Sequence, residues 1–134
     1  MTDSPKYLDA EHREIDHLLA EVEYLAQRRS YGVAKRRFRD FREQLLAHLR
    51  EEEDELFPAH LARFGDPQGV IAKLHEQHAQ LETALEAVAS ALDQGDYAEF
   101  CYGLTALSTL LAAHQHTEEE LWHRAGEAVQ APPP

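Results

Sequence analysis

The chain has 134 residues and a formal net charge of −12 at neutral pH. This length suits one domain with its own core, and 43% hydrophobic with 28% charged residues is ordinary for a soluble globular protein. The negative charge repels nucleic acid and anionic membranes, so we expect neither as a partner.

Apolar residues of the first half recur at spacings of three and four, which is typical of amphipathic helices. Ser4 and Pro5 suit a cap and a first helical residue, and the first helix should end near Arg29, before a break at residues 30–32. A second, long helix starts between residues 31 and 33. Pro58 should kink or end its regular part, and residues 59–64 can add a further turn or two.

The second half repeats this plan. In the joint Gly65-Asp66-Pro67, Asp66 and Pro67 are suited to cap and start a third helix, and residues 94–96 form a stop and cap before a fourth. Short joints between long helices predict an all-α, antiparallel, up-down-up-down four-helix bundle. We expect it to occupy residues 1–126, followed by a disordered tail over residues 127–134.

An internal repeat carries most of the functional signal. His48 and Glu52, four residues apart and therefore on one helical face, recur 66 residues later as His114 and Glu118. The same offset carries His12 onto His78 and matches several apolar positions, such as Ile15 with Leu81. The repeat therefore predicts a pseudo-twofold bundle with three polar residues in each half.

Counting along the helices places these residues at one depth. His12 and His48 each lie about 26 Å from the first turn at 1.5 Å per residue, and His78 and His114 match each other in the same way. Buried carboxylates and imidazoles are costly unless they are paired or bind a metal. A hydrogen-bonded polar layer is one solution. The other is two metal ions, each bound by two histidines and bridged by Glu52 and Glu118.

These motifs resemble the hemerythrin-like, or HHE cation-binding, domains. The resemblance covers about residues 8–122 and implies a bundle with two non-haem iron ions, bridged by carboxylates and with an oxo bridge as a further option. The implied metal ligands are His12, His48, Glu52, His78, His114 and Glu118. Glu119 is a rival to Glu118, because some members use a five-residue spacing.

One family position differs. Leu74 stands four residues before His78, where the family has a histidine, and His75 is the candidate substitute. With four histidine ligands, both metals would keep an open position. This favours peroxide, nitric oxide or redox chemistry over reversible oxygen carriage.

The expected function is a di-iron protein that binds, senses or reacts with O2, NO or peroxide. A catalase-like or ferroxidase enzyme at the same centre, and a metal-free or zinc-bound structural bundle, are the alternatives. No catalytic protein nucleophile is expected. The chain lacks signal-peptide features and long apolar runs, so we expect a cytoplasmic protein. We further expect a monomer or weak homodimer. We also expect His60 to be exposed and the acidic residues around Glu52, including Glu53, to form a solvated face.

Overall fold

The computed structural model describes residues 6–130, with side chains from residue 9 to residue 126. Every regular element in this part of the chain is helical. The elements are α1 (Lys6–Gln27), α2 (Tyr31–Glu51), the π-helix η1 (Glu52–Leu56), α3 (Phe57–Phe64), α4 (Val70–Asp93) and α5 (Tyr97–Gln130). Because α2, η1 and α3 follow one another without a break, they form one continuous helical segment. The described chain therefore has four such segments, as a four-helix bundle requires, and we call each of them a leg: α1, the second leg α2–η1–α3, α4 and α5.

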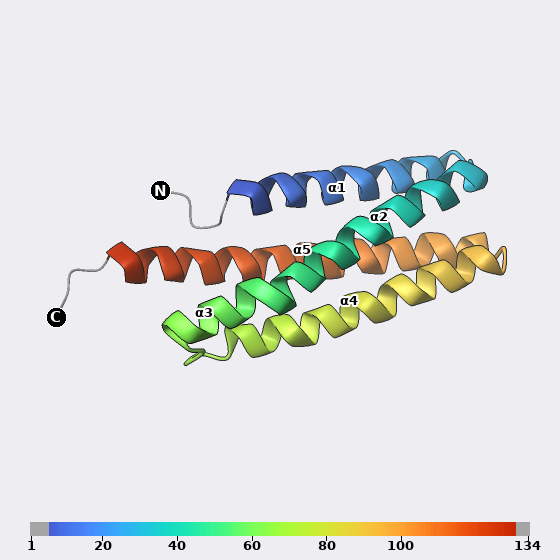
Figure 1. The fold of residues 1–134 in the computed structure, drawn as a ribbon. Coiled ribbons are helices and arrows are strands. Elements are labelled where there is room, and N and C mark those ends of the chain that lie inside the picture. The colour runs from blue at the N-terminus through green and yellow to red at the C-terminus, as the bar shows by residue number, and fades with distance from the viewer. Residues whose placement is uncertain (1–5, 131–134) are drawn as a thin grey trace.

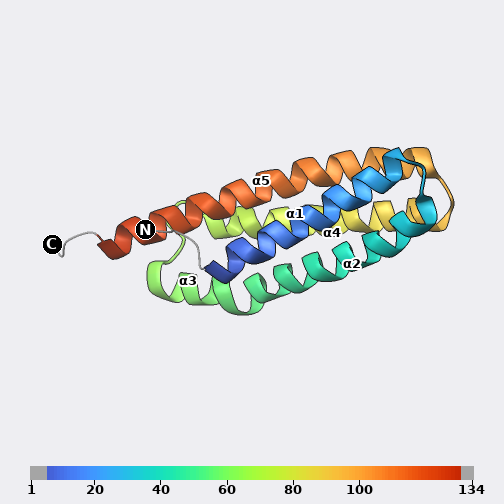
Figure 2. The same cartoon turned by 90° about the horizontal axis from the view of Figure 1, so that it is seen from above.

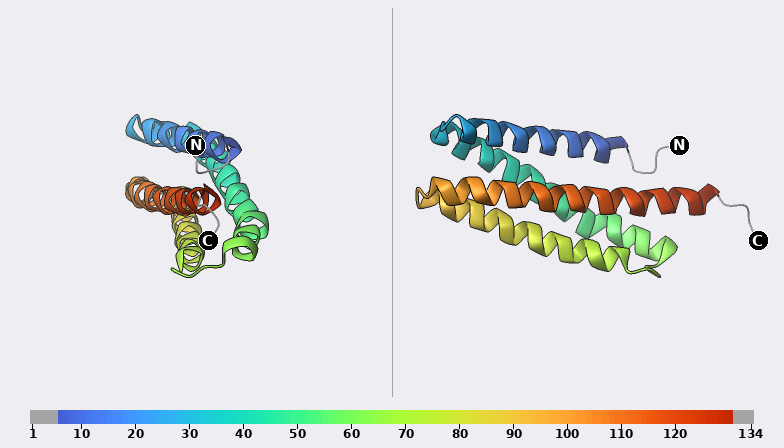
Figure 3. Two further views of the ribbon diagram at one scale, coloured as in Figure 1. Left: turned by 90° about the vertical axis from the view of Figure 1, so that its left-hand side faces the viewer. Right: turned by 180° about the vertical axis from the view of Figure 1, so that it is seen from behind.

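The legs lie side by side along one axis (Figures 1 and 2), with α1 packed chiefly on α2 and α4 packed chiefly on α5. The start of α1, the end of α5 and α3 all lie at one end of the bundle (Figure 3). The α1–α2 and α4–α5 turns lie at the other end. No helix within residues 6–130 is long and apolar enough to cross a membrane.

The buried apolar side chains form two clusters. The larger fills the bundle from the α1–α2 and α4–α5 turns as far as Leu49, Leu81 and Leu111. The smaller consists of Phe57, Ile71, Leu74 and Leu121, near the α3–α4 connection. The predicted polar positions on α4 and α5 fall between the two clusters in sequence. Apolar layers therefore flank the polar layer along the bundle axis.

The second leg contains a feature that the sequence analysis did not predict. Pro58 has no N–H group and should disturb the helix, but the leg continues through it to Phe64. The disturbance is taken up just before it, where the amide of Phe57 bonds to the carbonyl of Glu52, five residues back. Such π-turns interrupt α-helices mostly as single turns and often at functional sites.

The helix boundaries differ from the expected ones in two places. Asp66 caps α4 through hydrogen bonds from the amides of Ile71 and Ala72, at 3.0 and 3.1 Å. The helix nevertheless begins at Val70 and not at Pro67, because Gly69 adopts a left-handed φ of 71°. At the C-terminus the backbone is helical to Gln130. The expected disordered tail over residues 127–134 therefore includes four residues that are helical here, and residues 131–134 lie outside the described part.

Candidate metal centre

Side chains from all four legs meet at one level of the bundle. His12 comes from α1, His48 and Glu52 from the second leg, His78 from α4, and His114 and Glu118 from α5. We call these six residues the His/Glu cluster. Five of them are buried, and His12, with 12% of its side chain exposed, is the most accessible. The structure thus brings together all six residues that the repeat singled out.

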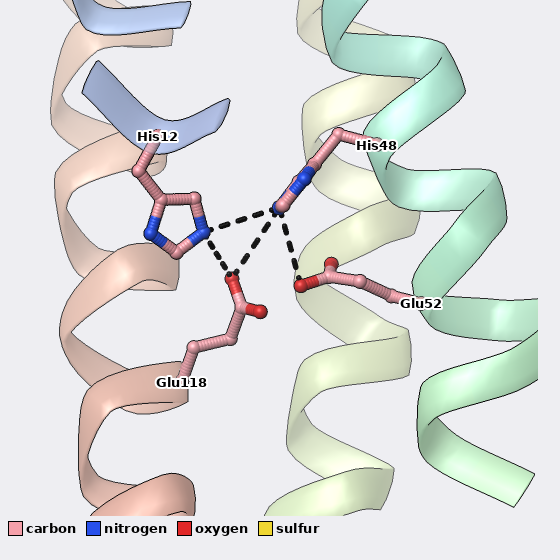
Figure 4. Close-up of side chains that lie close together, drawn as sticks. All are labelled: His12, His48, Glu52 and Glu118. Carbon is pink, nitrogen blue, oxygen red and sulfur yellow. Dashed lines mark hydrogen bonds and ion pairs between the residues drawn. The ribbon is translucent and has the colours of Figure 1, made fainter. Parts of the chain in front are cut away.

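Four members of the cluster converge from three legs, as Figure 4 shows. The Nε2 atoms of His12 and His48 are 3.1 Å apart. Oε2 of Glu118 lies 3.3 Å from His12 Nε2 and 3.9 Å from His48 Nε2. Oε2 of Glu52 lies 3.3 Å from His48 Nε2. Metal–imidazole bonds are about 2.1 Å long, so two nitrogens bound at right angles to one ion are about 3.0 Å apart.

The remaining histidines face the other oxygen of Glu52. Oε1 of Glu52 lies 2.9 Å from His78 Nε2 and 3.3 Å from His114 Nε2. Oε2 of Glu118 also lies 3.3 Å from His114 Nε2. The ligand atoms therefore form two groups, within each of which all atoms lie within 4.8 Å of one another. One group contains His12, His48, Glu52 and Glu118, and the other contains Glu52, His78 and His114. Glu52 belongs to both groups.

The outer nitrogens of three cluster histidines have hydrogen-bond partners. Nδ1 of His48 is 2.8 Å from Glu11, and Nδ1 of His78 is 2.7 Å from Glu53. Nδ1 of His114 is 3.0 Å from Oε1 of Gln77. These oxygens accept, so each imidazole donates from Nδ1. A neutral ring with its proton on Nδ1 directs the Nε2 lone pair into the cluster, as metal binding requires.

The electrostatics of the cluster suit a cation. Burial opposes ionisation of Glu52, but the imidazoles of His114, His48 and His78 outweigh burial and hold its pKa well below the ordinary 4.5. Burial lowers the pKa of His12 and of His114. Burial also opposes protonation of His48, yet Glu52 and Glu11 together raise its pKa. The buried carboxylates thus favour positive charge beside them, and a bound metal would supply it.

The hydrogen-bond inventory gives an independent test of whether a metal fits. Among the described side chains, five buried polar atoms lack a hydrogen-bond partner, and three of them are both carboxylate oxygens of Glu118 and Oε2 of Glu52. Buried polar groups are nearly always satisfied, and exceptions call for an explanation such as a missing ion. All three atoms belong to the cluster, and the Oε2 atoms of both glutamates face Nε2 atoms of its histidines. The donor set of imidazole nitrogens and carboxylate oxygens therefore fits a metal ion.

The two alternative metal ligands, Glu119 and His75, lie outside both groups. Glu119 is exposed. His75 is 46% exposed, and its Nδ1 lies 2.6 Å from Oε2 of Glu53.

Two expectations about nearby residues were wrong. Glu53 is only partly solvated, with 34% of its side chain exposed, because its two oxygens contact His78 and His75. His60 is buried, since α3 packs its ring edge-on against Trp122 of α5.

Glu11 and Gln77 are further hydrogen-bond partners of cluster histidines, and neither was predicted from the sequence. Glu11 directly precedes His12, and Gln77 directly precedes His78. Each contacts a histidine 37 positions away in the chain. Adjacency to a histidine was the available signal, but it does not say which histidine the side chain would reach.

Comparison with known proteins agrees with this geometry. The family model described as the hemerythrin HHE cation binding domain matches residues 3–125. No curated protein and no solved structure matches the chain. Since the family match spans nearly the whole chain, the protein belongs to the hemerythrin HHE cation-binding domain family.

Proposed function

We propose that the His/Glu cluster binds two iron ions and that this di-iron centre binds, senses or reacts with O2, NO or peroxide. The observation that carries the proposal is the position of Glu52, which directs Oε2 toward His48 and Oε1 toward His78 and His114. One carboxylate thus faces two histidine pairs, as a bridge between two ions would. Glu118, near His12 and His114, is the second bridging candidate.

The repeat in the sequence supports a symmetric arrangement. We propose an antiparallel up-down-up-down bundle in which a pseudo-twofold axis relates residues that are 66 positions apart. In this arrangement His12 and His48 bind one ion, and His78 and His114 bind the other. The chiefly pairwise packing of α1 on α2 and of α4 on α5 agrees with two related halves.

The ligand set is compatible with iron. Two histidines with one carboxylate and open positions are typical of non-haem Fe(II) sites, and Glu52, His78 and His114 form such a set. When bound, the iron pair supplies open coordination positions and one-electron redox chemistry. Leu74 precedes His78 by one turn of α4 and is fully buried, so an apolar side chain stands where the family pattern has a histidine.

The surroundings restrict the ligand to a small molecule. Apolar side chains flank the cluster along the bundle axis, and none of its members has more than 12% of its side chain exposed. A diatomic gas or peroxide suits such an enclosed, largely apolar site. We further propose a cytoplasmic monomer or weak homodimer.

The test is to load the protein anaerobically with Fe²⁺ and add O2, NO or hydrogen peroxide in separate stopped-flow experiments. A spectral change that reverses when a gas is removed indicates binding or sensing. Continued peroxide consumption or Fe²⁺ oxidation, lost in Glu52→Ala, indicates the enzymatic alternative. No response to any ligand, with folding unchanged after chelation, would contradict the proposal and favour a structural bundle.

A further inference from the structure

Glu53 links two histidines of α4 through its two oxygens. Oε1 lies 2.7 Å from Nδ1 of His78, and Oε2 lies 2.6 Å from Nδ1 of His75. Both rings also contact Phe57, which is fully buried: His78 stacks on it with centroids 5.3 Å apart, and His75 meets it edge-on at 5.4 Å. Glu53 and Phe57 therefore hold the two imidazoles from the second leg.

We propose that Glu53 is a positioning residue that fixes His78 for metal binding, and that His75 serves the centre by holding Glu53 in place instead of binding the metal. This inference rests on the proposed function. It gives His75, the candidate for the missing fifth histidine, an indirect role through one carboxylate.

The π-turn explains how Glu53 can act in this way. Glu52 and Glu53 are consecutive residues, yet both reach the same imidazole: Oε1 of Glu52 lies 2.9 Å from His78 Nε2, and Oε1 of Glu53 lies 2.7 Å from Nδ1. The two residues begin η1, where the helix is wider than an α-helix. A metal bound at Nε2 would replace only the contact with Glu52, and the Nδ1 contact with Glu53 would remain.

The acceptors of the Nδ1 hydrogen bonds make His78 and His114 metal ligands of unequal strength. His78 donates to a carboxylate, whereas His114, on the same proposed ion, donates to the neutral amide oxygen of Gln77. A charged acceptor strengthens the hydrogen bond and makes the imidazole a more basic ligand. In the other half of the site, Glu11 plays the corresponding role for His48. Loss of Glu53 should therefore selectively weaken the binding of the ion that His78 and His114 hold.

The test compares Glu53→Ala, Glu53→Gln and His75→Ala with wild type. Fe²⁺ affinities are measured anaerobically by competition with a chromophoric chelator, and Mössbauer spectra are recorded on protein loaded with ⁵⁷Fe. We expect Glu53→Ala to weaken the binding affinity for one of the two iron ions by about 10–100-fold, because loss of a ligand's hydrogen-bond partner typically has an effect of this size. One quadrupole doublet of the Mössbauer spectrum should change as well. Glu53→Gln should lose less Fe²⁺ affinity, because its amide oxygen can still accept a hydrogen bond from Nδ1–H of His78. His75→Ala should weaken the same equivalent by a smaller factor.

Two further variants serve as controls. Glu55→Ala changes an exposed carboxylate of the same π-turn and should leave both affinities unchanged. Glu11→Ala should affect the other equivalent. If Glu53→Ala binds both iron ions with the affinities of the wild type and shows unchanged doublets, this inference alone is overturned. If the wild-type protein itself binds no iron, the proposed function is overturned. If Glu53→Ala does not fold, the nearly isosteric Glu53→Gln decides: unchanged iron binding and spectrum overturn the inference.

Discussion

Glu118→Leu should stabilise the metal-free protein, although it removes a proposed metal ligand. The side chain of Glu118 is fully buried, and among the described groups neither of its oxygens has a hydrogen-bond partner. Burying a carboxylate costs several kcal/mol, whereas burying a leucine side chain gains about 1.5–3 kcal/mol. Against this gain, His12 and His114 each lose an oxygen at 3.3 Å.

Replacing a whole buried ion pair with apolar residues of similar size is often neutral or stabilising by about 1–4 kcal/mol, whereas removing one partner destabilises when the other stays charged. Burial lowers the pKa of His12 and of His114, so these imidazoles can stay neutral when Glu118 is removed. We expect a gain in this range for Glu118→Leu, measured by urea denaturation in a chelating buffer. The order should reverse with Fe²⁺, because a ligand at 100 times its dissociation constant stabilises the wild type by about 2.7 kcal/mol per site and the variant binds less. Glu119→Leu, at the exposed neighbouring position, should change stability by no more than about 0.5 kcal/mol. Destabilisation of the metal-free Glu118→Leu variant would refute the reasoning.

Three further changes test other parts of the structure. Burial lowers the pKa of His60, so the contribution of the neutral imidazole to the free energy of unfolding is fully present above pH 6.5 and is lost as pH falls through the lowered pKa. His60→Phe should therefore make the free energy of unfolding less pH-dependent in urea titrations between pH 5 and 7.5. An unchanged pH dependence would contradict this. Phe57→Ala should cost about 3–5 kcal/mol in urea denaturation, since it empties a fully buried position, and a loss below about 1 kcal/mol would argue against that packing. Asp66→Ala should cost about 1 kcal/mol in the same assay by removing the α4 cap, and no loss would show that the cap is dispensable.

The main features of the cluster could be predicted from the sequence because they depend on helix geometry alone. A spacing of four puts His48 and Glu52 on one face, and equal distances from a turn put His12 and His48 at one level. The contacts among these three residues in the structure agree with that counting. The cap of α5 was also predicted, and the amide of Glu99 bonds to Asp96 at 3.1 Å.

The features that were missed depend on contacts between distant segments. The run Glu51–Glu55 has the composition of a solvated helical face, and only the π-turn together with α4 turns Glu53 toward His75 and His78. His60 follows a proline in a short helix, where exposure is a reasonable expectation. It is buried because α3 packs against the end of α5, which local sequence does not specify.

The most direct test of the two-metal centre is the iron content of the protein. The protein is loaded anaerobically with Fe²⁺, desalted, and analysed for iron by elemental analysis. We predict about two irons per chain for wild type and for His116→Ala, which changes an exposed histidine of α5, and a loss of bound iron in His48→Ala. One iron per chain would contradict the bridging role of Glu52, and no iron would contradict the metal centre itself.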